Sequence, residues 1–271
     1  MGGIRHNDMQ ITLALGQMAV AWAQPDKNLE TAGRLAAGAA EAGADLLLLP
    51  ELWATGYDLA RTVRYAAHLS DPPFAEMGTL ARQHSLWMAG SLLESNPTGP
   101  PYNTLALFDP GGELAGYYRK IHLFPPMEET TYLSPGDRPV VLNLPWGPTG
   151  LATCYDLRFP DLWRRMRELD ARLVLIPAEW PARRVEHWRV LLRARAIENQ
   201  LVVAGCNRTG TDADGVFGGC SCVIDPWGHV LAEADEAPTL LLGRADLAEV
   251  DRTRTRFPFF SDRQPAVYGR G

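Results

Sequence analysis

Two unbroken apolar runs limit the folds that this chain can adopt. One covers residues 46–49, directly before Pro50 and Glu51, and the other is the sequence RLVLIPA at residues 172–178. Such runs lack the alternation of polar and apolar residues that a half-exposed strand shows, and they are typical of parallel strands buried on both faces. The chain is therefore predicted to be an α/β protein whose sheets are covered by helices.

The two halves of the chain repeat one order of elements. The sequence LLLLPELW at residues 46–53 resembles VLIPAEW at residues 174–180, and FDPGG at residues 108–112 resembles IDPWG at residues 224–228. The repeat predicts two similar mixed sheets that face one another with helices outside, a four-layer α-β-β-α sandwich. No linker separates the halves, so residues 1–271 are predicted to form a single domain.

The boundaries of helices and strands follow from hydrophobic periodicity and turn residues. Asp26 is the predicted N-cap of the first helix, which Gly43 ends, and further helices are predicted at residues 72–84, 160–169 and 182–199. Strands are predicted at residues 10–17, 46–49, 85–93, 103–108, 113–119, 140–144, 150–154, 172–178, 201–206, 221–225, 229–233 and 239–245.

Three segments fall outside this pattern. Residues 125–136 are predicted to be a loop, and residues 1–8 an extension that lacks the apolar segment of a signal peptide. Residues 251–271 contain prolines and aromatic residues without a clear period. This tail is predicted to pack on a neighbouring element or on a partner subunit.

Composition and charge exclude several classes of partner. The formal net charge is −6 and no block of Lys or Arg occurs, so nucleic acid is not an expected partner. No apolar run reaches the roughly 20 residues of a membrane helix, so no membrane association is expected. The four cysteines are expected to be free thiols in a reducing cytoplasm. Cys220 and Cys222 lack the C-x-x-C spacing of zinc and redox sites, and core packing is the better explanation for them.

Glu51, Lys120 and Cys154 each lie at the end of a predicted strand. Taken singly, each is better explained by a structural role. Together they provide a base, a thiol nucleophile, and a cation that can stabilise an oxyanion with the backbone N–H of Tyr155. Cys154 also precedes a helix predicted to begin at Pro160. Because a helix N-terminus and a nearby cation both favour a thiolate, an ionised nucleophile is expected.

Three motifs around these residues resemble those of the carbon–nitrogen hydrolase (nitrilase) superfamily. They are Leu49-Pro50-Glu51, YRKIHL at residues 118–123 and CYDLRFP at residues 154–160. The resemblance extends from about Gln10 to Tyr268 and implies that Glu51, Lys120 and Cys154 form the catalytic triad. It also implies a homodimer or larger homo-oligomer, and a mechanism that uses no metal and no organic cofactor.

The family places a second glutamate near the triad, in the loop after the lysine. Glu129 fits best by its distance from the turn LSPG at residues 133–136, and Glu128 is a close alternative. The implied role is to hold Lys120 and to help position the substrate amide or water.

The residues after Cys154 resemble the ω-amidase branch of the family. Its members hydrolyse the terminal amide of small α-keto acids, such as 2-oxoglutaramate, to acid and ammonia through a thioester. A carboxylate substrate calls for a cation. Arg183 is the first candidate and Arg184 and Arg195 are alternatives, whereas Arg158 is expected to pair internally. The other predicted substrate-binding residues are Tyr57, Phe124, Glu179 and Trp180.

Other functions are compatible with the same residues. A nitrilase or an N-carbamoyl amidohydrolase would share the triad and differ in pocket shape, and a catalytically silent binding subunit is a further alternative. A Cys-His hydrolase is also compatible, because Lys120 and His122 would point to one side if they share a strand.

Overall fold

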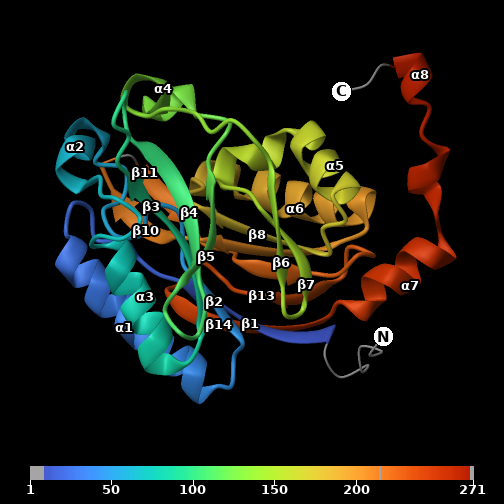
Figure 1. The fold of residues 1–271 in the computed structure, drawn as a ribbon, viewed down its shortest axis with the longest axis horizontal. Coiled ribbons are helices and arrows are strands. Elements are labelled where there is room, and N and C mark those ends of the chain that lie inside the picture. Colours follow the sequence, from blue (N-terminus) through green and yellow to red (C-terminus); the bar gives the residue numbers. More distant parts are fainter. Residues whose placement is uncertain (1–8, 214, 269–271) are drawn as a thin grey trace.

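The structure is a computed structural model that describes residues 9–213 and 215–268, so the predicted extension at residues 1–8 lies outside the described residues. Two six-stranded mixed sheets lie face to face, and helices cover the outer face of each sheet (Figure 1). The predicted four-layer α-β-β-α sandwich is confirmed.

The first sheet carries parallel strands at its centre. Across the sheet, the order is β14 (Thr239–Asp246), β1 (Gln10–Gln17), β2 (Leu46–Leu48), β3 (Trp87–Glu94), β4 (Tyr102–Phe108) and β5 (Leu114–Arg119). The β1–β2 and β2–β3 pairs are parallel, and the other pairs are antiparallel. Helices α1 (Pro25–Glu41) and α3 (Phe74–His84) pack on its outer face.

The second sheet repeats this arrangement. Its order is β13 (Val230–Glu233), β12 (Cys222–Ile224), β9 (Val202–Asn207), β8 (Leu173–Ala178), β7 (Gly147–Leu151) and β6 (Val140–Leu144). The β7–β8 and β8–β9 pairs are parallel. Helices α5 (Pro160–Glu168) and α6 (Val185–Asn199) cover its outer face.

Each apolar run contributes side chains to two cores, one between the two sheets and one between a sheet and its helices. Leu46 and Leu48 of β2 point into the core between the sheets, whereas Leu47 packs under the helices of the first sheet. In β8, Leu175 faces the core between the sheets and Val174 faces α5 and α6. Successive side chains of a strand point to opposite faces, so a strand with helices on one side and a second sheet on the other must be apolar throughout.

Several predicted boundaries were wrong for local reasons. Asp26 does not cap α1: Pro25 already occupies the first helical position, and Gln24 is the N-cap residue. The strand predicted at residues 150–154 ends at Leu151, because a 3₁₀-helix begins at Cys154. The loop predicted at residues 125–136 contains a 3₁₀-turn, η3 (Pro125–Met127), and a short helix, α4 (Glu129–Tyr132).

Sequence analysis missed five short or polar elements. They are η2 (Leu59–Arg61) with α2 (Thr62–Tyr65), the hairpin of β10 (Thr209–Asp212) and β11 (Gly215–Gly218), and α7 (Ala248–Arg256). The hairpin is rich in Gly and Asp, which signal turns rather than strands. Helix α7 is mostly charged, and its few apolar residues do not form a regular stripe.

The C-terminal tail runs from α7 along the side of the sandwich and ends away from it (Figure 1). It continues through η6 (Phe259–Asp262) to α8 (Pro265–Tyr268), and Arg263 forms an ion pair with Glu168 of α5. Packing of this tail on a partner subunit stays a prediction. No helix in the described ranges has the length and apolar character that crossing a membrane requires.

We expect Leu175→Ala to lower the free energy of unfolding by about 2–5 kcal/mol, because it opens a cavity between the two sheets. Leu242→Ala is the control, since Leu242 is 42% exposed on β14 and its truncation should cost less than about 0.5 kcal/mol. Urea-induced unfolding measures both. Equal losses in the two variants would contradict a dry core between the sheets.

Candidate active site

The ends of three strands bring Glu51, Lys120 and Cys154 together. Glu51 follows β2, Lys120 directly follows β5, and Cys154 follows β7. The Lys120 Nζ lies 2.8 Å from Glu51 Oε1, and both side chains are fully buried. The Glu51 carboxylate lies close enough to the Cys154 thiol to raise the pKa of that thiol. The three residues predicted from separate motifs therefore form one contact group.

A buried carboxylate, Asp156, shapes the turn that presents Cys154. Asp156 Oδ2 accepts the Thr153 N–H at 2.9 Å and the Tyr118 hydroxyl at 2.8 Å. The Asp156 N–H donates to the Thr153 carbonyl at 3.0 Å, and these contacts begin the 3₁₀-helix η4 (Cys154–Arg158). Cys154 has a φ of +44°, a left-handed conformation that costs a non-glycine residue about 1–3 kcal/mol. The N–H of Tyr155 lies in the first turn of η4, where N–H groups have no acceptor within the helix.

Three donors orient the Glu51 carboxylate. Lys120 Nζ and Asn103 Nδ2 both donate to Oε1 at 2.8 Å, and the Glu179 N–H donates to Oε2 at 3.0 Å. Sequence analysis missed Asn103, and the only available signal was its place at the start of a predicted strand. With these contacts satisfied, Glu51 is held facing the Cys154 thiol.

The expected thiolate at Cys154 is not supported by its surroundings. Burial and the Glu51 carboxylate raise the pKa of the Cys154 thiol well above its usual value, against the opposing effect of Lys120. Burial alone would lower the pKa of Lys120, but Glu129 and Glu51 outweigh it, so the ammonium stays charged. These surroundings favour a neutral thiol at Cys154, and such a thiol would need a base in order to act as a nucleophile.

Glu129, not Glu128, is the glutamate that contacts Lys120. Its Oε1 lies 2.6 Å from Lys120 Nζ and accepts the Tyr57 hydroxyl at 2.5 Å, while its Oε2 accepts the Phe124 N–H at 2.6 Å. Burial and Glu51 raise the pKa of Glu129, and Lys120 opposes them. Glu128 is exposed at the start of α4. The geometry thus separates two neighbours that the sequence left open.

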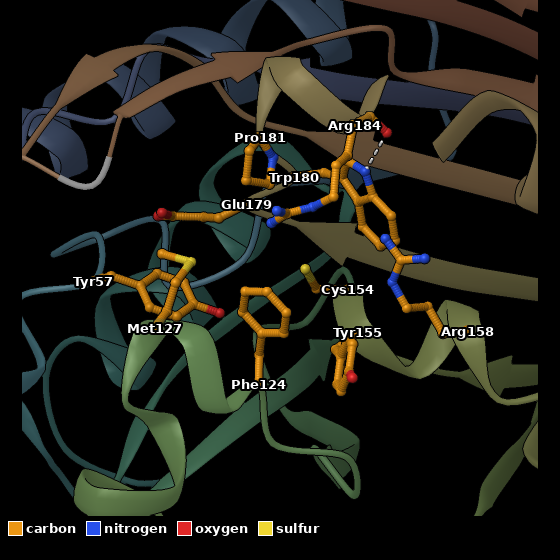
Figure 2. A pocket seen from close by; sticks show the side chains of 10 residues that line it. All are labelled: Tyr57, Phe124, Met127, Cys154, Tyr155, Arg158, Glu179, Trp180, Pro181 and Arg184. Atoms are coloured by element: carbon orange, nitrogen blue, oxygen red, sulfur yellow. Dashed lines mark hydrogen bonds between the residues drawn. The ribbon is translucent and has the colours of Figure 1, made fainter. Parts of the chain in front are cut away.

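A small pocket opens onto Cys154; its empty space, including the part open to solvent, is about 280 Å³. Figure 2 shows Cys154 at its centre, with Arg158 on one side and Tyr57 and Glu179 on the other. Its lining comprises Tyr57, Phe124, Met127, Cys154, Tyr155, Arg158, Glu179, Trp180, Pro181 and Arg184. Of the predicted substrate-binding residues, Tyr57, Phe124, Glu179 and Trp180 are part of this wall.

The arginine predictions need correction. Arg183 is exposed on η5 (Ala182–Arg184) and does not line the pocket, whereas its neighbour Arg184 does. Arg195 lies elsewhere, where its guanidinium donates to the Leu157 carbonyl and to Glu198. Arg158 was expected to pair internally, but its guanidinium stacks over the Trp180 ring at 4.7 Å and lines the pocket.

A buried ion network lies behind Glu179. Its Oε2 accepts a hydrogen bond from Arg208 Nη1 at 3.0 Å, and the same nitrogen lies 2.5 Å from Asp212 Oδ2. Burial raises the pKa of Glu179 to about 8 despite Arg208. Sequence analysis missed Arg208, although it lies only two residues after the apolar strand predicted at residues 201–206.

The contacts of His122 do not favour a role as the general base for Cys154. Strand β5 ends at Arg119, so Lys120 and His122 do not share a strand. The His122 Nδ1 lies 2.7 Å from Asp156 Oδ1, and its ring stacks on Phe159 with centroids 3.6 Å apart. Within residues 9–213 and 215–268, no group of three or more His, Cys, Asp or Glu side chains is placed to hold a metal ion.

Comparison with known proteins agrees with this geometry. A family model described as carbon-nitrogen hydrolase matches residues 12–255. The chain belongs to the carbon–nitrogen hydrolase family. It is 36% identical to 2-oxoglutaramate amidase of Bacillus subtilis, over 96% of this chain and 100% of that protein. It is 32% identical to omega-amidase NIT2 of Mus musculus, over 94% of this chain and 96% of that protein. The chain is an ω-amidase-like hydrolase of non-peptide carbon–nitrogen bonds.

Solved structures of the family share the fold. XC1258 of Xanthomonas campestris, a CN-hydrolase superfamily protein, has a TM-score of 0.88 and 30% identity, over 94% of this chain and 97% of that chain. An amidase mutant of Nesterenkonia sp. AN1 has a TM-score of 0.85 and 30% identity, over 98% of this chain and 97% of that chain. That amidase carries the acetamide moiety of fluoroacetamide covalently at its active-site cysteine.

We expect Glu129→Gln to lower kcat/KM for amide hydrolysis by about 10²-fold, because Lys120 loses the carboxylate that holds it and misplacement by about 1 Å has this effect. Glu128→Gln is the matched control and should match the unmodified protein, since Glu128 is exposed. Ammonia release from a primary amide measures both. A larger loss of activity in the Glu128 variant would show that Glu128, and not Glu129, is the second acid.

The raised pKa of Cys154 predicts the pH at which thiolate appears. Because the neutral thiol is favoured, thiolate absorbance assigned by difference from Cys154→Ser should be absent at about pH 6 and still rising above about pH 9. Ultraviolet difference titration of the free enzyme measures this. A full thiolate signal already present near neutral pH would contradict the neutral resting state.

Proposed function

We propose that this protein hydrolyses the terminal amide of a small carboxylic or α-keto acid, with 2-oxoglutaramate as the leading candidate, to acid and ammonia. The observation that carries the proposal is the Cys154 thiol in the lining of a small pocket, close to the ion pair of Glu51 and Lys120. The small size of the pocket and its mainly apolar and aromatic wall favour a short acyl chain. The relatives named 2-oxoglutaramate amidase and omega-amidase support this substrate class.

Acylation begins as Cys154 Sγ attacks the amide carbon and Glu51 accepts the thiol proton. The carbonyl oxygen becomes an oxyanion, which the Lys120 ammonium and the Tyr155 N–H stabilise. The carbon–nitrogen bond then breaks as Glu51 returns the proton to the leaving nitrogen. Ammonia departs and a thioester on Cys154 remains.

Deacylation uses the same groups on water. Glu51 accepts a proton from a water molecule that attacks the thioester carbon, and Lys120 again faces the oxyanion. The carbon–sulfur bond breaks, the thiol of Cys154 regains its proton from Glu51, and the carboxylic acid leaves. Each proton has a donor and an acceptor among these residues, so the cycle uses no cofactor.

The same triad would serve a nitrilase or an N-carbamoyl amidohydrolase, so the leaving group is part of the proposal. A catalytically silent binding subunit is the less favoured alternative. Binding alone would not require a fully buried lysine between two carboxylates. Burying these charges costs desolvation free energy, and such arrangements are typical of catalytic sites.

We also propose a single-domain, cytoplasmic homo-oligomer that takes a small-molecule amide. The family match across residues 12–255 supports one domain, and the four free, buried cysteines suit a reducing compartment. The exposed side chains of Phe257, Val267 and Tyr268 in the tail support contact with a partner subunit.

A substrate panel tests the activity. We expect ammonia release from α-keto acid ω-amides, with little turnover of nitriles and N-carbamoyl acids. Cys154→Ser should abolish it, and Glu51→Gln should lower kcat by about 10²–10⁴-fold because the base is lost. Full turnover in the Glu51 variant would contradict the mechanism, and turnover of nitriles with failure on every amide would contradict the substrate class.

A further inference from the structure

The wall of the pocket contains two arginines, Arg158 at the end of η4 and Arg184 at the end of η5. The Arg158 guanidinium lies over the Trp180 ring at 4.7 Å, and the Arg184 guanidinium lies 5.4 Å from the centroid of Phe124. Trp180 also donates its Nε1–H to the Arg184 carbonyl at 2.7 Å. Aromatic contacts therefore hold both cations beside Cys154.

Neither cation has a carboxylate partner among the described residues. Within the same ranges, Arg119, Arg195 and Arg208 form ion pairs with Glu or Asp. The polar contact of the Arg158 guanidinium is the ring nitrogen of His187 at 3.4 Å, a neutral or cationic group. The charges of Arg183 and Arg158 both act on the Arg184 guanidinium and lower its pKa.

This like-charge pair carries an electrostatic cost in the empty pocket. Burial lowers the pKa of Arg184, and repulsion from Arg183 and Arg158 lowers it further. An anion placed between two guanidiniums would relieve the repulsion and accept charge-assisted hydrogen bonds. Most of the remaining wall is apolar or aromatic, and its one carboxylate, Glu179, is already paired with Arg208. A fitting ligand has an apolar chain that ends in an anion.

We propose that Arg158 and Arg184 form the subsite for the carboxylate of the acyl chain, and thereby select monoamides of dicarboxylic acids over neutral amides. The inference rests on the proposed function, since it describes the same pocket. Figure 2 shows the Arg184 side chain reaching toward the middle of the pocket, with Arg158 beside Cys154. An amide carbon at Cys154 therefore places the far end of a short acyl chain within the field of both guanidiniums.

Two substrates of equal chain length separate carboxylate recognition from amide chemistry. Glutaramate carries the carboxylate, and pentanamide has a methyl group in its place. We expect Arg158→Gln and Arg184→Gln each to lower the preference for glutaramate over pentanamide, as the ratio of kcat/KM values, by about 10–100-fold, the range for a charged hydrogen bond. Arg183→Gln is the matched control on the same turn, and it should leave both substrates unchanged.

The outcomes separate the two proposals. If the unmodified protein cleaves neither substrate nor 2-oxoglutaramate, the proposed function fails. If it cleaves pentanamide as well as glutaramate, the function stands and the subsite fails. If the Arg158 and Arg184 variants lose kcat/KM equally on both substrates, the arginines have a structural role and the subsite is wrong. If Arg183→Gln lowers the preference for glutaramate as much as the Arg158 and Arg184 variants do, a long-range electrostatic effect explains the preference and the subsite is wrong.

Binding of the product analogue glutarate gives a readout that needs no turnover. Calorimetric titration of Cys154→Ala protein should show glutarate affinity at least about tenfold weaker when Arg184→Gln is added, and unchanged when Arg183→Gln is added. Adding Arg184→Gln should weaken the binding of pentanoate as much as that of glutarate, provided that pentanoate places its single carboxylate in the subsite. Affinity for glutarate that is independent of Arg184 would overturn the inference.

Discussion

The buried ammonium of Lys120 is the charge on which the site depends. Removing such a group from water costs several kcal/mol, and a single partner in ideal geometry barely offsets this. Here Glu51 lies at 2.8 Å and Glu129 at 2.6 Å, so Lys120 stays charged at the base of the pocket. Each contact also fixes a carboxylate: Glu51 is turned toward the thiol of Cys154, and Glu129 is tied to Tyr57 and to the Phe124 backbone. One cation thereby organises the base, the oxyanion site and one wall of the pocket.

The nucleophile is positioned by backbone geometry rather than by ionisation. Asp156 closes the turn through Thr153, Tyr118 and His122, and it compels Cys154 into a left-handed conformation that an isolated chain would avoid. In the mechanism that we propose, the neutral thiol depends on Glu51 to remove its proton. This division of labour explains why a buried cysteine with a raised pKa can still be a nucleophile.

The layers of the fold could be predicted because their signal is local. Residues 46–49 and 172–178 are apolar on both faces, and only a strand covered on both sides needs that pattern. The β10–β11 hairpin and α7 could not be predicted, since Gly and Asp residues in the first and charged residues in the second carry no hydrophobic period. These elements are stabilised by contacts with distant segments, such as the ion pair between Asp212 and Arg208 and the contact of Arg254 with Asp170.

The sequence by itself determined the family and the layered sheets, and it singled out Glu51, Lys120 and Cys154 as candidate site residues, because apolar runs and short contiguous motifs carry these signals. Only the tertiary structure decided between neighbours. Glu129 is buried against Lys120 while Glu128 faces solvent, and Arg184 lines the pocket while Arg183 does not. Adjacent side chains in a turn point in different directions, and burial depends on residues far away in the chain. The protonation state of Cys154 likewise follows from the burial and the charges that surround it in the folded protein.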